Sequence, residues 1–174
     1  MAEETFVILT RHGETIENRQ NVLQGHLPGH LTNKGKLQAH ELAKELKDEI
    51  IDVIICSDLA RSYDTALIIA NKRGLIPIST KLLREKDWGV LSGKHENPIF
   101  CNNTDDSIET SEQLYKRAGK FLNYLLENYH GKHILVIGHG CINMAITAHI
   151  RNIDINNIEN INMMDNGDIF KFKI

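Results

Sequence analysis

Long hydrophobic runs and targeting segments are missing from this 174-residue sequence. No stretch reaches the ~18 consecutive apolar residues of a membrane-spanning helix. The N-terminal residues begin acidic and lack the basic region that precedes the apolar run of a signal peptide. We therefore expect a cytoplasmic protein that does not bind a membrane.

Cysteine is scarce, and neither sign of charge is in large excess. Cys56, Cys101 and Cys141 form neither a paired framework nor a C-x-x-C metal motif, so we expect free thiols in a reducing compartment. The formal net charge of -3 gives no general attraction to nucleic acid. Any anion that the protein binds must be held by local cations.

Linkers, internal repeats and low-complexity tracts are also absent. Hydrophobic residues make up 41% of the chain and charged residues 25%, which is typical of a soluble globular protein with a substantial core. We therefore expect one domain over residues 1–174.

The remaining pattern alternates short apolar runs with amphipathic segments. Continuous β-branched runs at 6–10, 53–56 and 133–138 predict buried strands, and the run at 75–79 predicts another short one. Helices are expected after the N-cap Thr32, at 58–73 with Gly74 as its stop, at 111–131, and at about 142–151.

Near the end of the chain, Asn166-Gly167 lies between two apolar segments, which predicts a β-hairpin. The sheet is therefore expected to be mixed, mostly parallel with an antiparallel edge, and covered by helices on both faces. This is the α/β class, a three-layer α/β/α sandwich. Residues 92–108 lack periodicity and predict a short lid loop over the surface.

Three predicted strands end in polar residues that can carry out chemistry. These ends are Arg11-His12-Gly13, Cys56-Ser57-Asp58 with Arg61 one turn later, and Gly138-His139-Gly140. Because ligands of open α/β sheets bind at the carboxyl ends of the strands, we expect the three ends to converge. The glycines are expected to let the backbone approach an anion or adopt positive φ.

Two arginines and two histidines in one crevice suit a phosphoryl group, since guanidinium groups match phosphate oxygens. A neutral imidazole can attack phosphorus and form a phosphohistidine. Alternatively, His139 is a structural histidine, and Arg61 is a solvated helix residue paired with Asp58 or Asp64.

The leaving oxygen needs a proton donor near the same crevice. Glu85 is the first candidate, because a carboxyl that is desolvated by a pocket wall and faces a phosphate keeps its proton near neutral pH. Asp87 is the second, and Glu14 and Glu109 are rival carboxylates. Trp88 is expected in the pocket wall or the core.

His26 and His30 have i, i+4 spacing, which on a helix would suit a metal ion. Pro28-Gly29 lies between them and breaks any such helix, so we interpret both histidines as loop residues.

Together these motifs resemble the histidine phosphatase superfamily, also called the phosphoglycerate mutase-like family. The matching elements are Arg11-His12-Gly13-Glu14-Thr15, Asn18, Gln24-Gly25, Leu31-Thr32 with Gly35 and Gln38-Ala39, Ser57-Asp58-Leu59 with Arg61, Leu83 with Glu85, and Gly138-His139-Gly140. They follow in order over nearly the whole chain.

The resemblance implies roles for individual residues. His12 would be the phosphorylated nucleophile, Glu85 the proton donor, and Arg11, Arg61 and His139 the ligands of the phosphoryl oxygens. Asn18 would also contact the phosphate, and the backbone of Gln24, Gly25 and Gly140 would line the pocket. The resemblance implies no metal and no organic cofactor.

The family contains phosphatases, mutases and non-catalytic phospho-ligand adaptors. Mutases carry a long insertion after the acidic residue and a C-terminal tail over the site, whereas here a short segment and a predicted strand occupy these places. The stretch from Glu85 to Gly93 nevertheless fits the mutase pattern as well as the phosphatase pattern. For the carboxylate of a phosphoglycerate, only Lys94, Lys116 and Arg117 are available.

We therefore expect a phosphatase, with a phosphoglycerate mutase as the alternative and an adaptor as a second alternative. The expected partner is a small phosphorylated substrate, such as a sugar phosphate or an alpha-ribazole phosphate-like compound. The presence of Glu85 favours an oxygen ester over a phosphorylated nitrogen. The oligomeric state stays open.

Overall fold

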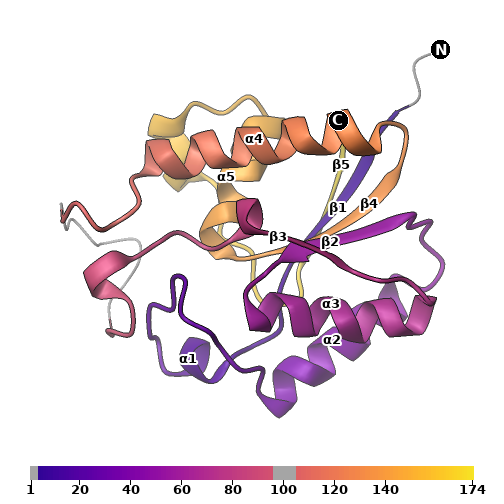
Figure 1. Cartoon of the computed structure of the whole chain (residues 1–174), viewed down its shortest axis with the longest axis horizontal. Coiled ribbons are helices and arrows are strands. Elements are labelled where there is room, and N and C mark those ends of the chain that lie inside the picture. Colours follow the sequence, from indigo (N-terminus) through magenta and orange to yellow (C-terminus); the bar gives the residue numbers. More distant parts are fainter. Residues whose placement is uncertain (1–3, 96–104) are drawn as a thin grey trace.

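A computed structural model of the chain describes residues 4–95 and 105–174, which form a five-stranded sheet between two layers of helices (Figure 1). The strand order is β3-β2-β4-β1-β5. Strands β1 to β4 pair in parallel, and β5 is antiparallel to β1. The expected mixed α/β/α sandwich with an antiparallel edge is confirmed.

The strands span Phe6–Arg11 (β1), Val53–Ser57 (β2), Ile78–Thr80 (β3), His133–Gly138 (β4) and Ile169–Lys173 (β5). The helices span Ile16–Arg19 (α1), Asn33–Glu45 (α2), Ala60–Arg73 (α3), Ser111–Tyr129 (α4) and Gly140–Ile150 (α5). Three short 3-10 helices span Lys81–Leu83 (η1), Gly89–Leu91 (η2) and Ile155–Asn160 (η3). Within the described residues, no helix is both long and apolar enough to cross a membrane.

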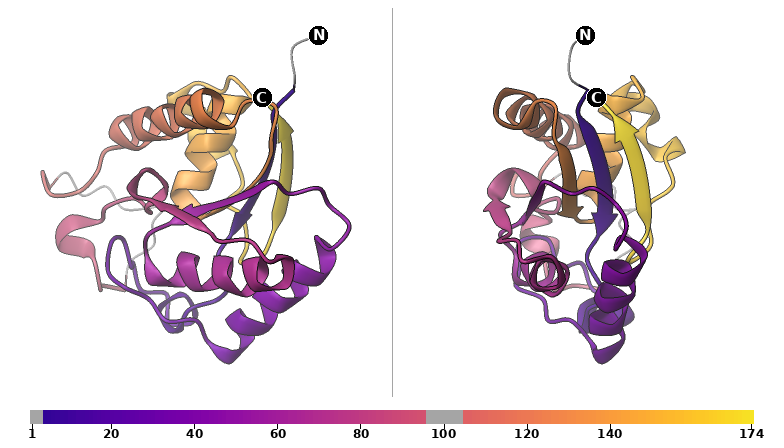
Figure 2. Two further views of the ribbon diagram at one scale, coloured as in Figure 1. Left: turned by 45° about the vertical axis from the view of Figure 1, so that its right-hand side comes forward. Right: turned by 90° about the vertical axis from the view of Figure 1, so that its right-hand side faces the viewer.

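The central strands are apolar on both faces because each face is covered. In β1, Val7 and Leu9 pack in one core with residues of α4 and α5, whereas Ile8 packs in the other with residues of α2 and α3. The same alternation occurs in β2 and β4. Figure 2 shows the helices on either side of the sheet, with β1 and β5 side by side.

The helix ends follow local signals. The Thr32 side chain accepts a hydrogen bond from the Gly35 N–H at 2.9 Å, as expected of an N-cap. Gly74 ends α3 in the left-handed conformation with φ 66°, also as expected. Helix α5 begins at Gly140 rather than near 142, because the chain enters the helix directly after β4 with His139 as N-cap.

The predicted hairpin at Asn166-Gly167 is wrong. Residues 161–165 form no strand, and β5 pairs with β1 instead. Met164 is buried in the core and its carbonyl oxygen accepts a hydrogen bond from Arg11, which holds the preceding segment away from β5. The dipeptide still forms a turn, closed by an Asp168 N–H to Asp165 carbonyl bond of 3.1 Å.

The predicted lid loop is described only in part. Its first residues lie beside the loop before α2, through an isolated bridge between Val22 and His95. Residues 96–104, with Cys101, lie outside the described residues.

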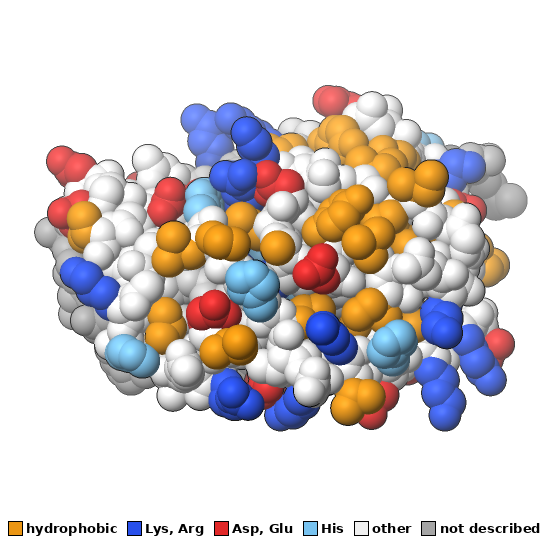
Figure 3. Space-filling model, turned by 60° about the horizontal axis from the view of Figure 1, so that its bottom comes forward, with side chains coloured by type: hydrophobic (Ala, Val, Ile, Leu, Met, Phe, Trp, Pro, Cys, Tyr) orange, Lys and Arg blue, Asp and Glu red, His pale blue; other side chains and the backbone are white. Residues whose placement is uncertain are grey.

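The face that carries α2 and α3 has acidic and basic side chains interspersed among apolar ones over most of its area (Figure 3). This arrangement agrees with the nearly balanced charge of the chain.

Candidate active site

The candidate site lies at the carboxyl ends of β1 and β4. Arg11 and Gly138 are partners in the parallel ladder, so the residues that follow them, His12 and His139, emerge side by side. Their ring centroids are 5.0 Å apart at an interplanar angle of 62°. The expected convergence of these two strand ends is therefore present in the fold.

His12 is held in one tautomer. Its Nδ1 lies 2.7 Å from the carbonyl oxygen of Gly13, which can only accept, so Nδ1 carries the proton and the Nε2 lone pair is free. The side chain is buried, and burial, together with Arg61 and Arg11, holds the pKa of His12 well below its ordinary value of 6.5. The imidazole is therefore neutral at neutral pH and able to act as a nucleophile.

Arg61 is the most bulky of the fully buried side chains, with 1% of its surface exposed. Its Nη1 and Nη2 donate to the carbonyl oxygens of Leu27 and Gly25 at 2.8 and 2.9 Å. Burial lowers the pKa of Arg61 to about 10, so the side chain stays charged at neutral pH. The alternative of a solvated arginine paired with Asp58 or Asp64 is wrong, because Arg61 is buried, and Asp58 binds Arg84 instead, at 2.8 and 2.6 Å.

Arg61 also fixes the tautomer of His139. Its Nε donates to Nδ1 of His139 at 3.2 Å, which places the proton of the neutral ring on Nε2. The pKa of His139 lies well below its ordinary value, chiefly through burial and then through Arg61. Within the described residues, the buried Nε2 has no hydrogen-bond partner. His139 thus presents an unused donor, which suits an anionic ligand.

Arg11 has donors left as well. Its Nη1 donates to the Met164 carbonyl oxygen at 2.7 Å, whereas its Nε is buried without a partner in the described part of the chain. Two guanidinium groups and one imidazole N–H therefore lie near His12. This set can neutralise and orient a phosphoryl group.

Asn18 is oriented by its own helix end. Its Oδ1 accepts from the Thr15 N–H at 3.2 Å and from Nδ2 of Asn166 at 3.4 Å, which leaves the amide of Asn18 to donate toward the pocket. Asn166 also donates to the carbonyl oxygen of His12 at 2.8 Å.

Asn166 was missed as a site residue because its dipeptide was interpreted only as a turn. Antiparallel pairing of β5 with β1 would have placed that turn at the end of β1, beside His12.

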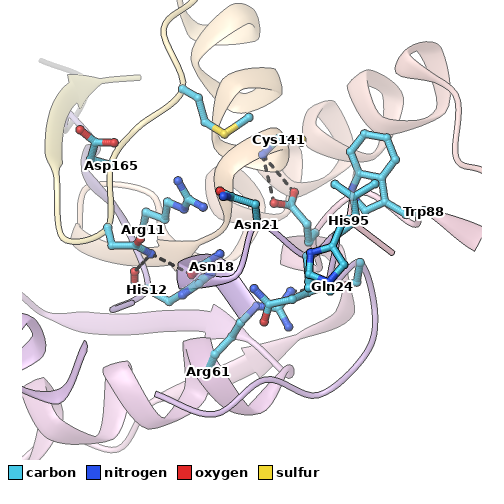
Figure 4. A pocket seen from close by; sticks show the side chains of 16 residues that line it. Arg11, His12, Asn18, Asn21, Gln24, Arg61, Trp88, His95, Cys141 and Asp165 are labelled. Atoms are coloured by element: carbon cyan, nitrogen blue, oxygen red, sulfur yellow. Dashed lines mark hydrogen bonds between the residues drawn. The ribbon is translucent and has the colours of Figure 1, made fainter. Parts of the chain in front are cut away.

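These side chains line a cavity of about 660 Å³. Arg11, His12 and Asn18 lie at one end and Trp88 and His95 at the other (Figure 4). The wall also contains Asn21, Val22, Leu23, Gln24, Gly25, Arg61, Glu85, Cys141, Met163, Asp165 and Asn166. Trp88 is nearly buried and belongs to both the wall and a small core cluster, as expected.

Two of the predicted residues lie behind the wall rather than in it. His139 is fully buried, and its ring is in edge contact with that of His12. Gly140 packs beneath Met163, since a Cβ on Gly140 would lie 2.7 Å from the Met163 sulfur.

Gly13, Gly138 and Gly140, at the strand ends, are glycines for a different reason than the one expected. None of the three strand-end glycines has positive φ. A Cβ on Gly13 would lie 2.3 Å from the Gly35 carbonyl oxygen, and one on Gly138 would lie 2.1 Å from Oδ1 of Asn143. These positions require glycine because other parts of the protein pack against them.

Glu85 is the only one of the four carboxylates considered that lines the cavity. Its surroundings differ from the expected apolar wall. Its Oε1 accepts from the backbone N–H groups of Lys86, Cys141 and Ile142 at 2.9, 3.0 and 3.2 Å. Its Oε2 has one longer contact, at 3.3 Å from the Cys141 N–H. The first turn of α5 therefore orients the carboxyl at the edge of the cavity.

The rival carboxylates are engaged elsewhere. Asp87, the second candidate, faces His26 at 3.4 Å and accepts from the Gly89 N–H. Glu14 accepts from Thr32, and this hydrogen bond is the main cause that lowers its pKa. Glu109 binds the guanidinium of Arg117.

His26 also contacts the segment that carries Glu85, since its Nε2 lies 2.9 Å from the Glu85 carbonyl oxygen. Across residues 4–95 and 105–174, no three His, Cys, Asp or Glu side chains are grouped to hold a metal ion.

Sequence comparison places the chain among known proteins. The profile of the histidine phosphatase superfamily, branch 1, matches residues 7–174. A protein of Hydrogenobacter thermophilus whose name proposes a phosphoserine phosphatase is 31% identical over 92% of this chain and 85% of its own. The phosphoglycerate mutase-like protein 4 of Arabidopsis thaliana is 32% identical over 83% of this chain and 70% of its own.

Structure comparison gives similar neighbours. The alpha-ribazole phosphatase of Shigella flexneri superimposes with a TM-score of 0.85 at 25% identity, over 95% of this chain and 89% of its own. A mycobacterial glucosyl-3-phosphoglycerate phosphatase superimposes with a TM-score of 0.87 over 98% of this chain and 90% of its own. Its identity is 22%, so this second likeness concerns the fold.

Proposed function

The chain belongs to the histidine phosphatase superfamily, and we propose that it hydrolyses small phosphomonoesters through a phosphohistidine intermediate on His12. One observation supports this proposal above the others: the Nδ1 contact to Gly13 leaves the Nε2 lone pair of a neutral His12 free beside Arg11 and Arg61.

In the first step, Arg11, Arg61 and the amide of Asn18 bind the phosphoryl oxygens from the cavity wall. The buried Nε2–H of His139, which has no partner among the described residues and lies beside His12, is the donor that meets the phosphoryl group as it bonds to His12. Nε2 of His12 attacks phosphorus in line, the bond from phosphorus to the ester oxygen breaks, and the departing oxygen takes a proton from Glu85. In the second step, water gives a proton to the Glu85 carboxylate and attacks the phosphohistidine. Inorganic phosphate leaves, and His12 returns to its neutral form.

The hydrogen bonds of Glu85 support the position of the carboxyl that we propose as the proton donor. Three backbone N–H groups occupy Oε1, whereas Oε2 has a single longer contact and is the oxygen that we assign to the proton. The contacts to α5 fix the carboxyl at the cavity, as proton transfer requires.

The cations of the cavity support a phosphatase rather than a mutase. Beyond Arg11 and Arg61, no lysine or arginine lines the described wall, and the sequence of residues 96–104 contains neither. A phosphoglycerate carboxylate would therefore meet no permanent positive charge beyond those that bind the phosphoryl group. The names of the relatives support small phosphorylated metabolites as substrates.

We further propose that the reaction needs no metal ion, because two guanidinium groups can neutralise the phosphoryl charge and an imidazole N–H can donate to it. The free thiols of Cys56 and Cys141 support a reducing compartment such as the cytoplasm.

The test is phosphate release by the purified protein in the presence of a chelator, from a panel of small phosphomonoesters that includes phosphoserine and 3-phosphoglycerate. His12→Ala should lower kcat/KM at least about 1,000-fold, and radiolabelled substrate quenched in denaturant should label wild-type protein but not this variant. His40→Ala, a change on the exposed face of α2, is the matched control. Full turnover by His12→Ala, or phosphoglycerate interconversion with little release, would contradict the proposal.

A further inference from the structure

Arg117, in α4, uses all of its N–H groups within the protein. Its Nε and Nη2 donate to Oε1 and Oε2 of Glu109 at 2.9 and 2.7 Å. Its Nη1 donates to the carbonyl oxygens of Leu82 and Arg84 at 2.9 and 2.6 Å. Its Nη2 also donates to the carbonyl oxygen of Glu85 at 3.2 Å. A guanidinium has five N–H donors, so none remains for a substrate.

Of the three carbonyl groups that Arg117 binds, that of Leu82 lies in η1, and those of Arg84 and Glu85 lie in the segment that follows it. Between η1 and η2 this segment has no regular secondary structure, and therefore no ladder of backbone hydrogen bonds holds it in place. Carbonyl groups in such a segment need other partners. Arg117 supplies them from one planar group, and 17% of its side-chain surface is exposed.

Glu109 completes this arrangement. Its carboxylate binds Arg117 in the bidentate geometry that fixes a guanidinium plane. Its Oε2 also accepts from the Asp87 N–H at 3.0 Å, and its own N–H donates to the Asp87 carbonyl oxygen at 2.8 Å. Arg117 and Glu109 thus hold the backbone on both sides of Glu85.

The carboxyl of Glu85 is held separately, by the first turn of α5. The backbone of the residue is therefore bound to α4 and its side chain to α5. Since a displacement of about 1 Å at a reacting group can cost roughly 100-fold in rate, this double attachment matters for proton transfer.

We propose that Arg117, oriented by Glu109, is the positioning residue of the proton donor Glu85, and that turnover of esters with poor leaving groups depends on it. The inference rests on the proposed role of Glu85. It predicts a loss that depends on the leaving group, because an alcohol of high pKa needs the donated proton and a nitrophenol does not.

The experiment compares kcat/KM for an alkyl phosphate from the active panel with kcat/KM for 4-nitrophenyl phosphate. This ratio reports departure of the alcohol and is independent of hydrolysis of the phosphohistidine, which both esters share. The variants are Arg117→Gln, Arg117→Lys and Glu109→Gln, with Glu85→Gln as the reference. Arg73→Gln is the matched control, since Arg73 also donates to backbone carbonyl groups, those of Leu46 and Glu49, at the far end of α3.

For Arg117→Gln we expect kcat/KM of the alkyl ester to fall roughly 10- to 100-fold and that of 4-nitrophenyl phosphate to fall less than about threefold. Arg117→Lys keeps the positive charge but lacks the planar guanidinium that binds several acceptors at once. Glu109→Gln keeps the shape of the side chain but cannot form the bidentate ion pair. For each of these variants we expect kcat/KM of the alkyl ester to fall more than that of 4-nitrophenyl phosphate, but by a smaller factor than in Arg117→Gln. Arg73→Gln should leave the ratio of the two values unchanged.

A double variant, Glu85→Gln with Arg117→Gln, should lose no more than Glu85→Gln alone, because Arg117 acts through Glu85. Equal losses on both esters, or an unchanged ratio in folded Arg117→Gln, would overturn the positioning role. If Arg117→Gln does not fold, the ratios of Arg117→Lys and Glu109→Gln decide in the same way. If Glu85→Gln itself leaves the alkyl ester unaffected, the proposed function fails at its proton donor and the positioning role fails with it.

Discussion

The Nε atom of Arg61 lies 3.2 Å from Nδ1 of His139, and both side chains are buried. This contact joins α3 to the end of β4 and leaves the Nε2–H of His139 as a donor. It also places a permanent positive charge next to two histidines, which is one reason why their pKa values are lowered.

The first prediction concerns stability below neutral pH. His12 and His139 have pKa values lowered well below 6.5 in the folded protein, so below pH 6.5 the unfolded chain binds more protons than the folded one. The contribution of the two histidines to the free energy of unfolding is therefore fully present above pH 6.5 and is lost as the pH decreases below it. Each histidine contributes up to about 1.4 kcal/mol per pH unit.

Urea denaturation in phosphate-free buffer at several values between pH 7.5 and 5 measures this effect. Carboxylates with lowered pKa values, such as Glu14, begin to reduce stability only as the pH approaches their ordinary value of 4.5, so the histidine slope is taken from the points between about pH 7.5 and 5.5. His139→Gln should reduce the slope by about half. A free energy of unfolding that stays constant over this range would rule out buried neutral histidines.

The second prediction concerns Arg61→Lys. A lysine lacks the planar guanidinium that donates to the Gly25 and Leu27 carbonyl oxygens and to Nδ1 of His139 at the same time. Some of these buried acceptors would therefore lose their donor. We expect the free energy of unfolding to fall by about 1–3 kcal/mol and kcat/KM to fall at least roughly 100-fold. Arg73→Lys, measured by the same melts and assays, should leave kcat/KM near the wild-type value.

The third prediction concerns Asn166→Asp, which keeps the shape of the side chain but removes its N–H donor. The new carboxylate would face the carbonyl oxygen of His12 and Oδ1 of Asn18, both of which are acceptors. We expect kcat/KM to fall roughly tenfold through displacement of these two residues. Asn157→Asp, on the exposed side of η3, is the control, and equal activity of the two variants would contradict the assignment.

The fourth prediction concerns Gly13→Ala. The added methyl group would lie 2.3 Å from the backbone oxygen of Gly35, so β1 and α2 must separate. We expect a loss of about 1–3 kcal/mol in the free energy of unfolding. Gly74→Asn, where nothing lies within 4 Å and a left-handed residue is tolerated, should cost less than about 1 kcal/mol. Denaturant melts of both variants measure these losses, and an equal free energy of unfolding for Gly13→Ala and wild type would contradict the close packing of Gly13 against Gly35.

Some of this site could be predicted from the chain and some could not. The convergence of His12 and His139 follows from two β-branched runs and the rule that parallel strands end at one edge. The tautomers do not follow, because they depend on single contacts to Gly13 and Arg61 made only in the folded chain. The polar surroundings of Glu85 depend in the same way on the position of α5.

The wrong hairpin has a related cause. Asn166-Gly167 is a strong local signal, but the free edge of β1 offers β5 a longer partner than residues 161–165 do. Arg117 shows the opposite case, since the three carbonyl groups that it binds lie 32 to 35 residues away along the chain and no short pattern connects them. Contacts between distant residues decided both outcomes.

Strand β1 is flanked by β4 on one edge and by β5 on the other. During translation the strand that leads into His12 therefore leaves the ribosome long before either of its neighbours exists. Pairing between residues so far apart in the chain is slow, and an unpaired strand edge is prone to aggregation. A nascent chain can assemble α2, β2 and α3 early, but His139 and Asn166, which contact His12, emerge late, so an N-terminal fragment of this protein lacks part of the candidate site.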